Sequence, residues 1–193
     1  MTVATVVTLS VTVTLAFIGY VATYRNNLRL DRQKARLERV NLQLSDFYGP
    51  LLANAAASGI AWLAFRSRYR PTMDSFWGGL TTPTADEAAA WRLWMKEVFM
   101  PLNLRMEAVV VERADLLEES EMPQALLLLC AHVEAYKTVL KQWDEGDYSE
   151  HASVINFPAE EVQQYARDRF TQLKSEQLRL LGVLQQERPA MGR

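Results

Sequence analysis

The 193-residue sequence predicts an all-α protein, with one N-terminal transmembrane helix that continues into a stalk and then an antiparallel cytoplasmic helical bundle of about four helices. Three observations predict this fold: an uncharged apolar stretch at residues 2–24, apolar residues spaced by three and four along most of the chain, and helix start and stop signals joined by short loops. We divide the chain into a transmembrane helix (1–24), a basic juxtamembrane stalk (25–49), a bundle (50–186) and a tail (187–193).

The first stretch, residues 2–24, contains no charged side chain. As a helix it is about 34 Å long, enough to cross a hydrocarbon core of about 30 Å. A cleaved signal peptide is the alternative, but that needs a positive segment before the apolar run and a small-x-small site after it. Neither is present before Arg25, so the stretch predicts a membrane span.

Basic residues follow the span and none precedes it. This asymmetry predicts an N-terminus outside and a C-terminal domain in the cytoplasm. We expect the basic residues to set this topology and to contact anionic lipid head groups. They are Arg25, Arg29, Arg32, Lys34, Arg36 and Arg39.

Small residues occupy one helical face of the span, at steps of three and four. Small side chains let helix backbones approach closely, and threonine hydroxyls bond across helices. The sequence therefore predicts a packing face for another membrane helix. Its members are Thr5, Thr8, Thr12, Ala16, Gly19 and Thr23. The alternative is that these threonines bond the carbonyls of their own helix.

The stalk repeats leucine every seven residues, at positions 30, 37, 44 and 51, with Val40 and Phe47 between them. This heptad stripe predicts either a coiled coil or a face that packs on the chain's own domain. Gly49 and Pro50 then predict a helix stop and restart, with a kinked continuous helix as the alternative.

The bundle is predicted from four helical patterns. The first spans residues 50–68 and ends before Pro71, and the second opens at a capping box, Thr84 to Glu87, with a kink expected near Met100. The third follows Met122-Pro123 and has apolar residues at 126, 129, 133, 136, 140 and 143. The last starts at Asn156-Phe-Pro158. The inner face of the second is expected at Trp91, Trp94, Met95, Val98, Leu102 and Val109.

Charge and composition exclude some classes of function. The net charge of −2 divides into +6 over residues 25–70 and −8 over residues 71–193. An acidic distal part disfavours nucleic acid as a partner. The single cysteine, Cys130, lies in an apolar run and is expected to be a buried structural residue.

No motif in the sequence predicts catalysis, a metal or a cofactor. His132 and His151 lack the Glu-x-x-His spacing of a metal site in a bundle, and we expect His132 to be a satisfied core or surface histidine. Gly78-Gly79 lacks the lysine of a phosphate loop. Candidate partner contacts are an aromatic pair in a loop and a polar helix end: Phe76, Trp77, Trp143, Asp147 and Tyr148.

Five segments resemble a family of uncharacterised bacterial single-span membrane proteins: FYGPL (47–51), FMPLN (99–103), EMP (121–123), AHVEAYK (131–137) and LKSEQLRLLG (173–182). The resemblance covers nearly the whole chain. It implies the fold, the topology and a single-pass location in the bacterial cytoplasmic (inner) membrane, and no activity.

Two functions fit these observations. The first is a non-enzymatic accessory subunit of a multi-subunit membrane complex, such as a photosynthetic or respiratory one, whose partners are other membrane-protein subunits. The alternative is a single-span signalling or stress-response protein with a ligand-sensing bundle. That alternative predicts a defined pocket, together with a parallel dimer through Leu30, Leu37 and Leu44.

Overall fold

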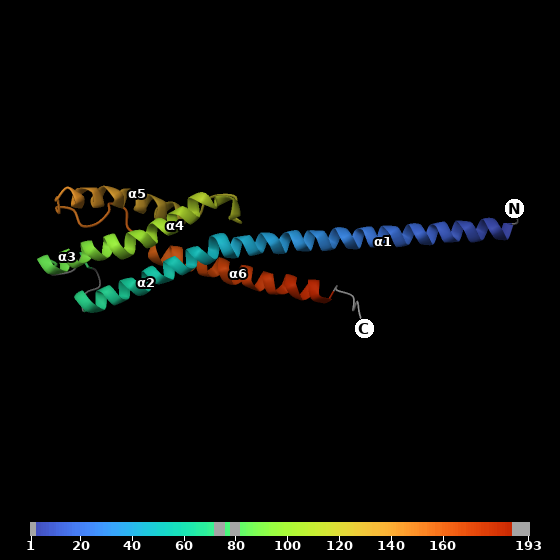
Figure 1. The fold of residues 1–193 in the computed structure, drawn as a ribbon, viewed down its shortest axis with the longest axis horizontal. Coiled ribbons are helices and arrows are strands. Elements are labelled where there is room, and N and C mark those ends of the chain that lie inside the picture. Colours follow the sequence, from blue (N-terminus) through green and yellow to red (C-terminus); the bar gives the residue numbers. More distant parts are fainter. Residues whose placement is uncertain (1–2, 72–75, 78–81, 187–193) are drawn as a thin grey trace. The chain divides into compact units, whose positions relative to one another are not determined.

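The computed structural model describes the backbone of residues 3–71, 76–77 and 82–186, and the side chains of residues 12–71, 76–77 and 82–182. Within these ranges every regular element is a helix (Figure 1). The prediction of an all-α protein with about four bundle helices is confirmed. The predicted tail at 187–193 lies outside the described residues.

Contacts divide the chain into two compact units. The first comprises Met1–Asn41 and Ser175–Arg193, and the second comprises Leu42–Lys174. Helix α1 (Val3–Leu42) and helix α6 (Ala159–Gln186) each extend across a boundary in the sequence, whereas the elements between them lie in the second unit.

In the first unit, α1 carries large apolar side chains on its exposed surface. Val13, Leu15, Phe17 and Ile18 are between 57% and 66% exposed. Among the residues that the structure describes, no helix is long and apolar enough to cross a membrane.

The heptad stripe becomes buried along its length. Leu30 and Leu37 are half-buried, and the later positions Val40, Leu44, Phe47 and Leu51 are buried. Most of the stripe is therefore covered by side chains of the same chain, which is one of the two arrangements that the sequence leaves open.

The predicted helix stop at Gly49 is wrong. Helix α1 continues through a π-helical turn, η1 (Gln43–Tyr48), directly into α2 (Gly49–Tyr69). Gly49 has right-handed helical angles, φ −65° and ψ −55°, and its amide donates to the carbonyl of Leu44 five residues earlier. This wider turn leaves room for Pro50, which has no amide hydrogen to donate. The alternative of a continuous helix is the one that forms.

The second predicted bundle helix is interrupted in the same way. Helix α3 (Ala85–Trp94) begins at the predicted capping box, where Thr84 and Glu87 exchange hydrogen bonds. A second π-helical turn, η2 (Met95–Phe99), then leads into α4 (Met100–Glu112), with Pro101 in its first turn. The structure therefore has a π turn just before Met100, the position near which the sequence predicts a kink.

The π turn also changes which side chains of this helix are buried, so the predicted inner face is partly wrong. The buried positions of η2 and α4 are Met95, Phe99, Met100, Asn103, Met106 and Val110, whereas Val98, Leu102 and Val109 are only half-buried. A π turn contains one more residue than a regular helical spacing assumes. Past Met95 the stripe is therefore displaced by one position.

Two long helices complete the second unit, after a short 3₁₀ turn, η3 (Ala114–Leu116). Helix α5 (Gln124–Asp144) buries five of its six predicted stripe positions, Leu126, Leu129, Val133, Tyr136 and Trp143. Helix α6 follows Pro158, as predicted, and buries Val162, Ala166 and Leu173. Helix α2 packs against α4, and α4 packs against α5 (Figure 1).

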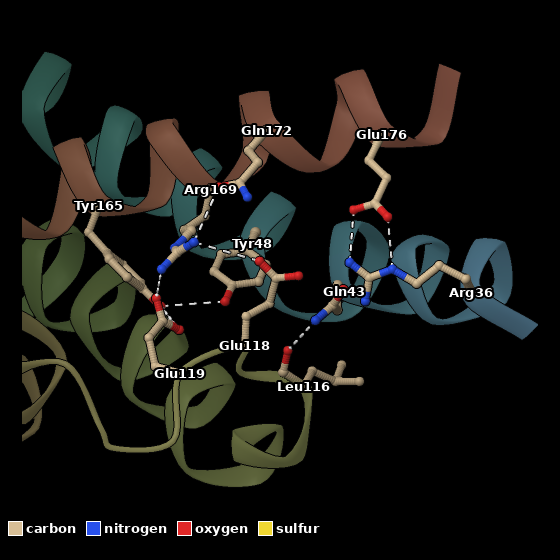
Figure 2. Close-up of polar contacts among 10 residues, drawn as sticks. All are labelled: Arg36, Gln43, Tyr48, Leu116, Glu118, Glu119, Tyr165, Arg169, Gln172 and Glu176. Carbon is tan, nitrogen blue, oxygen red and sulfur yellow. Dashed lines mark hydrogen bonds and ion pairs between the residues drawn. The ribbon is translucent and has the colours of Figure 1, made fainter. Parts of the chain in front are cut away.

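A polar network joins α6 to other parts of the second unit (Figure 2). Arg169 of α6 forms an ion pair with Glu119, and Tyr165 donates to the same carboxylate at 3.1 Å. The hydroxyl of Tyr48 lies 3.4 Å from that of Tyr165. Burial raises the pKa of both tyrosines, so their hydroxyls keep their protons. Glu118 and Glu119, which precede α5 in the chain, both face Arg169.

Candidate functional site

The second unit contains a cavity of about 400 Å³. Its walls come from α2, α3, η2, α4, α5, the loop at residues 145–158 and the start of α6. Ligand sites in proteins have volumes of about 300–1,000 Å³ and are lined mainly by apolar side chains. The lining residues are Ala55, Ser58, Gly59, Trp62, Trp77, Trp91, Met95, Phe99, Asn103, His132, Tyr136, Ala152, Ser153, Ile155, Asn156, Phe157, Ala159 and Gln163.

Helix α2 makes room for the cavity with small residues. Ser58 and Gly59 lie on the lining side one helical turn before Trp62, and Ala55 lies one turn earlier still. A β-carbon added at Gly59 would meet its nearest neighbour, the Gln163 side chain, at 3.8 Å. The space at this position is therefore open enough to accept a larger side chain.

Aromatic rings form much of the remaining wall. The ring centroids of Trp62 and Trp91 are 6.0 Å apart in an edge-to-face arrangement, and that of Phe99 lies 6.2 Å from Trp62 and 5.9 Å from Trp91. Such pairs fix one another's orientation and stabilise a core beyond the area that they bury. The wall is therefore preformed, since its rings are held by other rings.

Four side-chain donors hold the loop at 145–158 against the helices. The loop forms one side of the cavity, and each donor bonds a backbone carbonyl in it. Trp143 Nε1 bonds Glu150 at 2.8 Å, Trp91 Nε1 and Tyr136 Oη bond His151 at 2.8 and 2.9 Å, and His132 Nδ1 bonds Ile155 at 2.6 Å. Side chains far apart in sequence thereby fix the loop in place.

His132 lines the cavity with one ring nitrogen unpartnered. The side chain is only 4% exposed. Because the carbonyl of Ile155 can only accept, Nδ1 must be the protonated nitrogen. Burial lowers the pKa of His132, which keeps the ring neutral at pH 7. Nε2 therefore has a free lone pair, and this buried atom has no hydrogen-bond partner. The sequence prediction of a satisfied histidine is wrong on this point.

Asn103 of α4 supplies a second unpartnered acceptor. Its side chain is 2% exposed, and its Oδ1 atom is buried without a hydrogen-bond partner. A third lining residue, Trp77, has a buried donor, Nε1, that also lacks a partner. More than nine in ten buried polar groups in proteins have a partner, so three unpartnered atoms on the residues of one cavity are unusual.

The cavity lining contains no Asp, Glu, Lys or Arg among the described residues. In the same part of the chain, no group of His, Cys, Asp and Glu is arranged to hold a metal ion. The arrangement is therefore suited to binding an uncharged molecule.

The candidate partner contacts separate into buried and accessible residues. Phe76 is 3% exposed and Trp143 is 2% exposed, so both pack inside the second unit. Trp77 lines the cavity, and its ring stacks on His151 with centroids 4.2 Å apart. Tyr148 is exposed and lies beneath the guanidinium of Arg92 at 4.3 Å. Asp147 accepts a hydrogen bond from the amide of Ser149, which lowers its pKa.

The predicted packing face for another membrane helix lies partly outside the residues whose side chains the structure describes. Thr5 and Thr8 lie outside the residues whose side chains the structure describes. Thr12, Ala16, Gly19 and Thr23 are exposed on α1. The hydroxyl of Thr23 donates to the carbonyl of Gly19 at 2.9 Å, which is the bond within the helix that the sequence leaves open as an alternative.

The basic residues lie in the first unit. Arg25, Arg29, Arg32 and Arg36 line a shallow groove together with Arg179. Arg36 forms two hydrogen bonds of 2.8 Å to Glu176, which lower the pKa of that carboxyl (Figure 2). Lys34 pairs with Asp31 at 3.9 Å, and Arg39 is half-buried.

Comparison with known proteins finds no matching family model, no matching curated protein and no matching solved structure. The resemblance to bacterial single-span membrane proteins therefore stays a prediction.

Acidification should destabilise the second unit as the pH falls below about 6.5. The unfolded chain has the ordinary histidine pKa, whereas burial lowers the pKa of His132 in the folded state. At pH values between the pKa of the folded state and that of the unfolded chain, the unfolded state binds more protons. The free energy of unfolding therefore falls as the pH falls. Thermal melting followed by circular dichroism from pH 8 to pH 5 measures the effect. The His132→Phe variant should have a flatter profile, and an equally steep one would contradict the assignment.

Proposed function

We propose that this chain is a membrane-anchored protein whose helical domain binds a small, mainly apolar molecule in the cavity. The supporting observation is a mostly apolar cavity of about 400 Å³, whose lining residues Trp77, Asn103 and His132 each have a buried polar atom without a hydrogen-bond partner. Of the two functions that the sequence leaves open, this observation favours the ligand-sensing one. An accessory subunit that only covers a surface has no need of such a cavity.

The empty cavity is energetically unfavourable for two reasons. Leaving a buried acceptor without a partner costs about 1–3 kcal/mol. Covering aromatic walls of this kind with an apolar molecule also stabilises the filled state, by about 25 cal/mol per Å² of apolar surface that is removed from water. A molecule that covers the mostly apolar wall of the cavity therefore makes the filled domain more stable than the empty one. Ligand binding would raise its stability by mass action.

Filling the cavity tests the proposal. In the Gly59→Leu variant the new side chain has room to enter the cavity, because a β-carbon there has no neighbour closer than 3.8 Å. Naphthalene should raise the melting temperature of the full chain in mild detergent, and the Gly59→Leu variant should lose this shift.

Gly182→Leu is the matched control, since a β-carbon there meets no atom within 4 Å and Gly182 does not line the cavity. It should melt with the same naphthalene shift as the unsubstituted chain. Equal shifts in the Gly59→Leu and Gly182→Leu variants would contradict binding in the cavity.

The anchor is proposed at residues 2–24, with the N-terminus outside and the helical domain on the cytoplasmic side of a bacterial inner membrane. The uncharged sequence, the basic residues that follow it and the exposed apolar side chains of α1 support this. Residues 2–11 of the proposed span lie outside the described side chains. Alkaline extraction should leave the chain in the membrane pellet, and its release into the supernatant would contradict the anchor.

The second candidate function is the accessory subunit of a membrane complex. It is favoured by the exposed face at Thr12, Ala16 and Gly19, where a β-carbon on Gly19 would meet no atom of this chain within 4 Å. A larger side chain there changes what the helix presents to a neighbour and leaves its own packing intact. Membrane interfaces of this kind depend on small residues.

Replacing both Thr12 and Gly19 by leucine should therefore weaken co-purification of other membrane subunits in mild detergent. A control with Val13→Leu and Phe17→Leu changes side chains off this face and should leave recovery unchanged. Unchanged recovery in the Thr12 and Gly19 variant, or migration of the unsubstituted chain as a free monomer, would contradict the accessory-subunit proposal.

A further inference from the structure

We propose that the groove of arginines on helices α1 and α6 is a binding site for an anionic phospholipid whose head group carries two phosphate groups. This inference rests on the membrane anchor proposed above, and it concerns the first unit, whereas the cavity lies in the second. Three features of the groove lead to it: the register of its arginines, its place directly after the proposed span, and the leucines among its charges.

Arginines from two helices line the groove. Four of them lie on α1, and successive members are four, three and four residues apart, which places them on one side of the helix: Arg25, Arg29, Arg32 and Arg36. The fifth, Arg179, comes from α6. The described lining residues include no Asp or Glu. Guanidinium groups bind phosphate oxygens through paired hydrogen bonds, so the groove suits a phosphate-bearing anion.

Glu176 of α6 connects the two helices beside the groove (Figure 2). Its carboxylate accepts two hydrogen bonds of 2.8 Å from Arg36 and lies 3.8 Å from Arg179. The next residue, Gln177, donates to the side chain of Asn41 at 2.6 Å. These contacts hold Arg179 next to the arginines of α1. Glu176 carries one negative charge against the five positive charges of the described lining residues, so the groove keeps an excess of positive charge.

The groove begins where the proposed span ends. Arg25 directly follows residues 2–24. Just before it, the rings of Tyr20 and Tyr24 stack with centroids 6.3 Å apart, and both side chains are exposed. Tyrosine is enriched at the head-group level of membrane helices. This pair therefore supports a membrane surface close to Arg25, which puts the near end of the groove at the depth of the lipid phosphates.

The length of the groove favours a head group with two phosphates. Arg25 and Arg32 are seven residues apart, which is about 10 Å along a helix axis. A guanidinium that binds bidentately uses both free oxygens of one phosphodiester. Arginines spread over this length therefore have room for more than one phosphate. Two phosphates in one molecule bind more tightly than two separate lipids, because the second contact forms within the same complex.

Two leucines favour a lipid over a free phosphate ion. Leu28 and Leu180 line the groove between its arginines, and Leu28 is 38% exposed. An inorganic anion gains nothing from apolar surface, whereas the first carbons of an acyl chain remove such surface from water. Leu28 also follows the exposed apolar side chains of α1 in the chain. The groove therefore matches the junction between a charged head group and its acyl chains.

Native mass spectrometry of the full chain in mild detergent tests the ligand class. Cardiolipin has two phosphates, phosphatidylglycerol has one, and phosphatidylcholine has no net charge; each is titrated at the same phosphate concentration, with inorganic pyrophosphate as a soluble anion. We expect cardiolipin to bind at least about fivefold more tightly than phosphatidylglycerol, which is the factor that one additional arginine contact supplies. Phosphatidylcholine and pyrophosphate should bind more weakly than either.

Substitutions assign the preference to the groove. Arg32→Gln and Arg179→Gln should each weaken cardiolipin binding about fivefold. Lys34→Gln is the control on α1, because Lys34 is exposed, pairs with Asp31 at 3.9 Å and does not line the groove. Arg167→Gln is the control on α6, because Arg167 is exposed in the second unit and does not line the groove. Both controls remove one positive charge and should retain the affinity for cardiolipin.

The outcomes separate this inference from the anchor on which it rests. Equal affinity for cardiolipin and phosphatidylglycerol would overturn the requirement for two phosphates. Pyrophosphate binding as tight as that of cardiolipin would overturn the assignment to a lipid. Equal losses in the groove variants and in the two controls would overturn the assignment to the groove. Each of these results leaves the anchor standing, whereas release of the chain by alkaline extraction would overturn the anchor and this inference together.

Discussion

Replacing Gly49 by alanine should lower the free energy of unfolding by about 2 kcal/mol. A β-carbon at this position would lie 2.3 Å from the carbonyl oxygen of Leu44, which is a backbone atom held in the π turn. Overpacking of this kind costs about 1–3 kcal/mol. The expected loss is larger than the gain of up to about 1 kcal/mol that alanine gives over glycine in a helix. Urea unfolding followed by circular dichroism measures the difference.

Gly59→Ala is the matched control in the same helix. Its new β-carbon would have no neighbour closer than 3.8 Å, so only the gain in helix propensity remains. This variant should be more stable than the unsubstituted chain by about 0.5–1 kcal/mol. Equal stabilisation by both substitutions would contradict the role assigned to Gly49 in the π turn.

Replacing Asn103 by leucine should stabilise the empty protein by about 1 kcal/mol. The substitution removes a buried acceptor that has no partner, and the leucine side chain has the neighbouring cavity to occupy. Removing an unsatisfied buried polar group recovers about 1–3 kcal/mol, from which imperfect packing of leucine subtracts. The increase is measurable as a rise in melting temperature of several degrees.

Asn54 is an asparagine with a hydrogen-bond partner and serves as the control. Asn54 lies on α2 and donates to the carbonyl of Pro50, so Asn54→Leu removes a hydrogen bond and should not stabilise the protein. A gain in Asn103→Leu with no gain in Asn54→Leu would indicate that Asn103 is kept for binding at the expense of stability. Destabilisation by Asn103→Leu would contradict the orphaned state of its oxygen.

Local patterns were sufficient to predict the helices of the second unit. The capping box at Thr84 fixed the start of α3, and Pro158 fixed the start of α6, because both act on the backbone next to them. The α5 stripe followed the regular helical spacing and was predicted nearly completely. The α4 stripe was displaced by one position after the π turn at Met95–Phe99, which no spacing rule anticipates.

The candidate site was not predictable in the same way. Asn103 lies within FMPLN, and its polar side chain belongs to the buried face only once η2 has displaced the stripe. His132 was expected to be satisfied; its Nδ1 is bonded to the carbonyl of Ile155, 23 residues later in the chain, whereas its Nε2 has no partner. Small residues on α2 at Ala55 and Gly59 were the one available signal, because they leave space beside Trp62.

The sequence by itself determined the helical class, most helix boundaries and the uncharged stretch that predicts the anchor. These depend on residues close together in the chain, whose propensities, caps and charges act locally. Only the tertiary structure decided that α1 continues into α2 through a π turn, and that Asn103 and His132 share a cavity. Those outcomes depend on which distant groups meet, and one additional residue in a helical turn is enough to rotate every later side chain onto a different face.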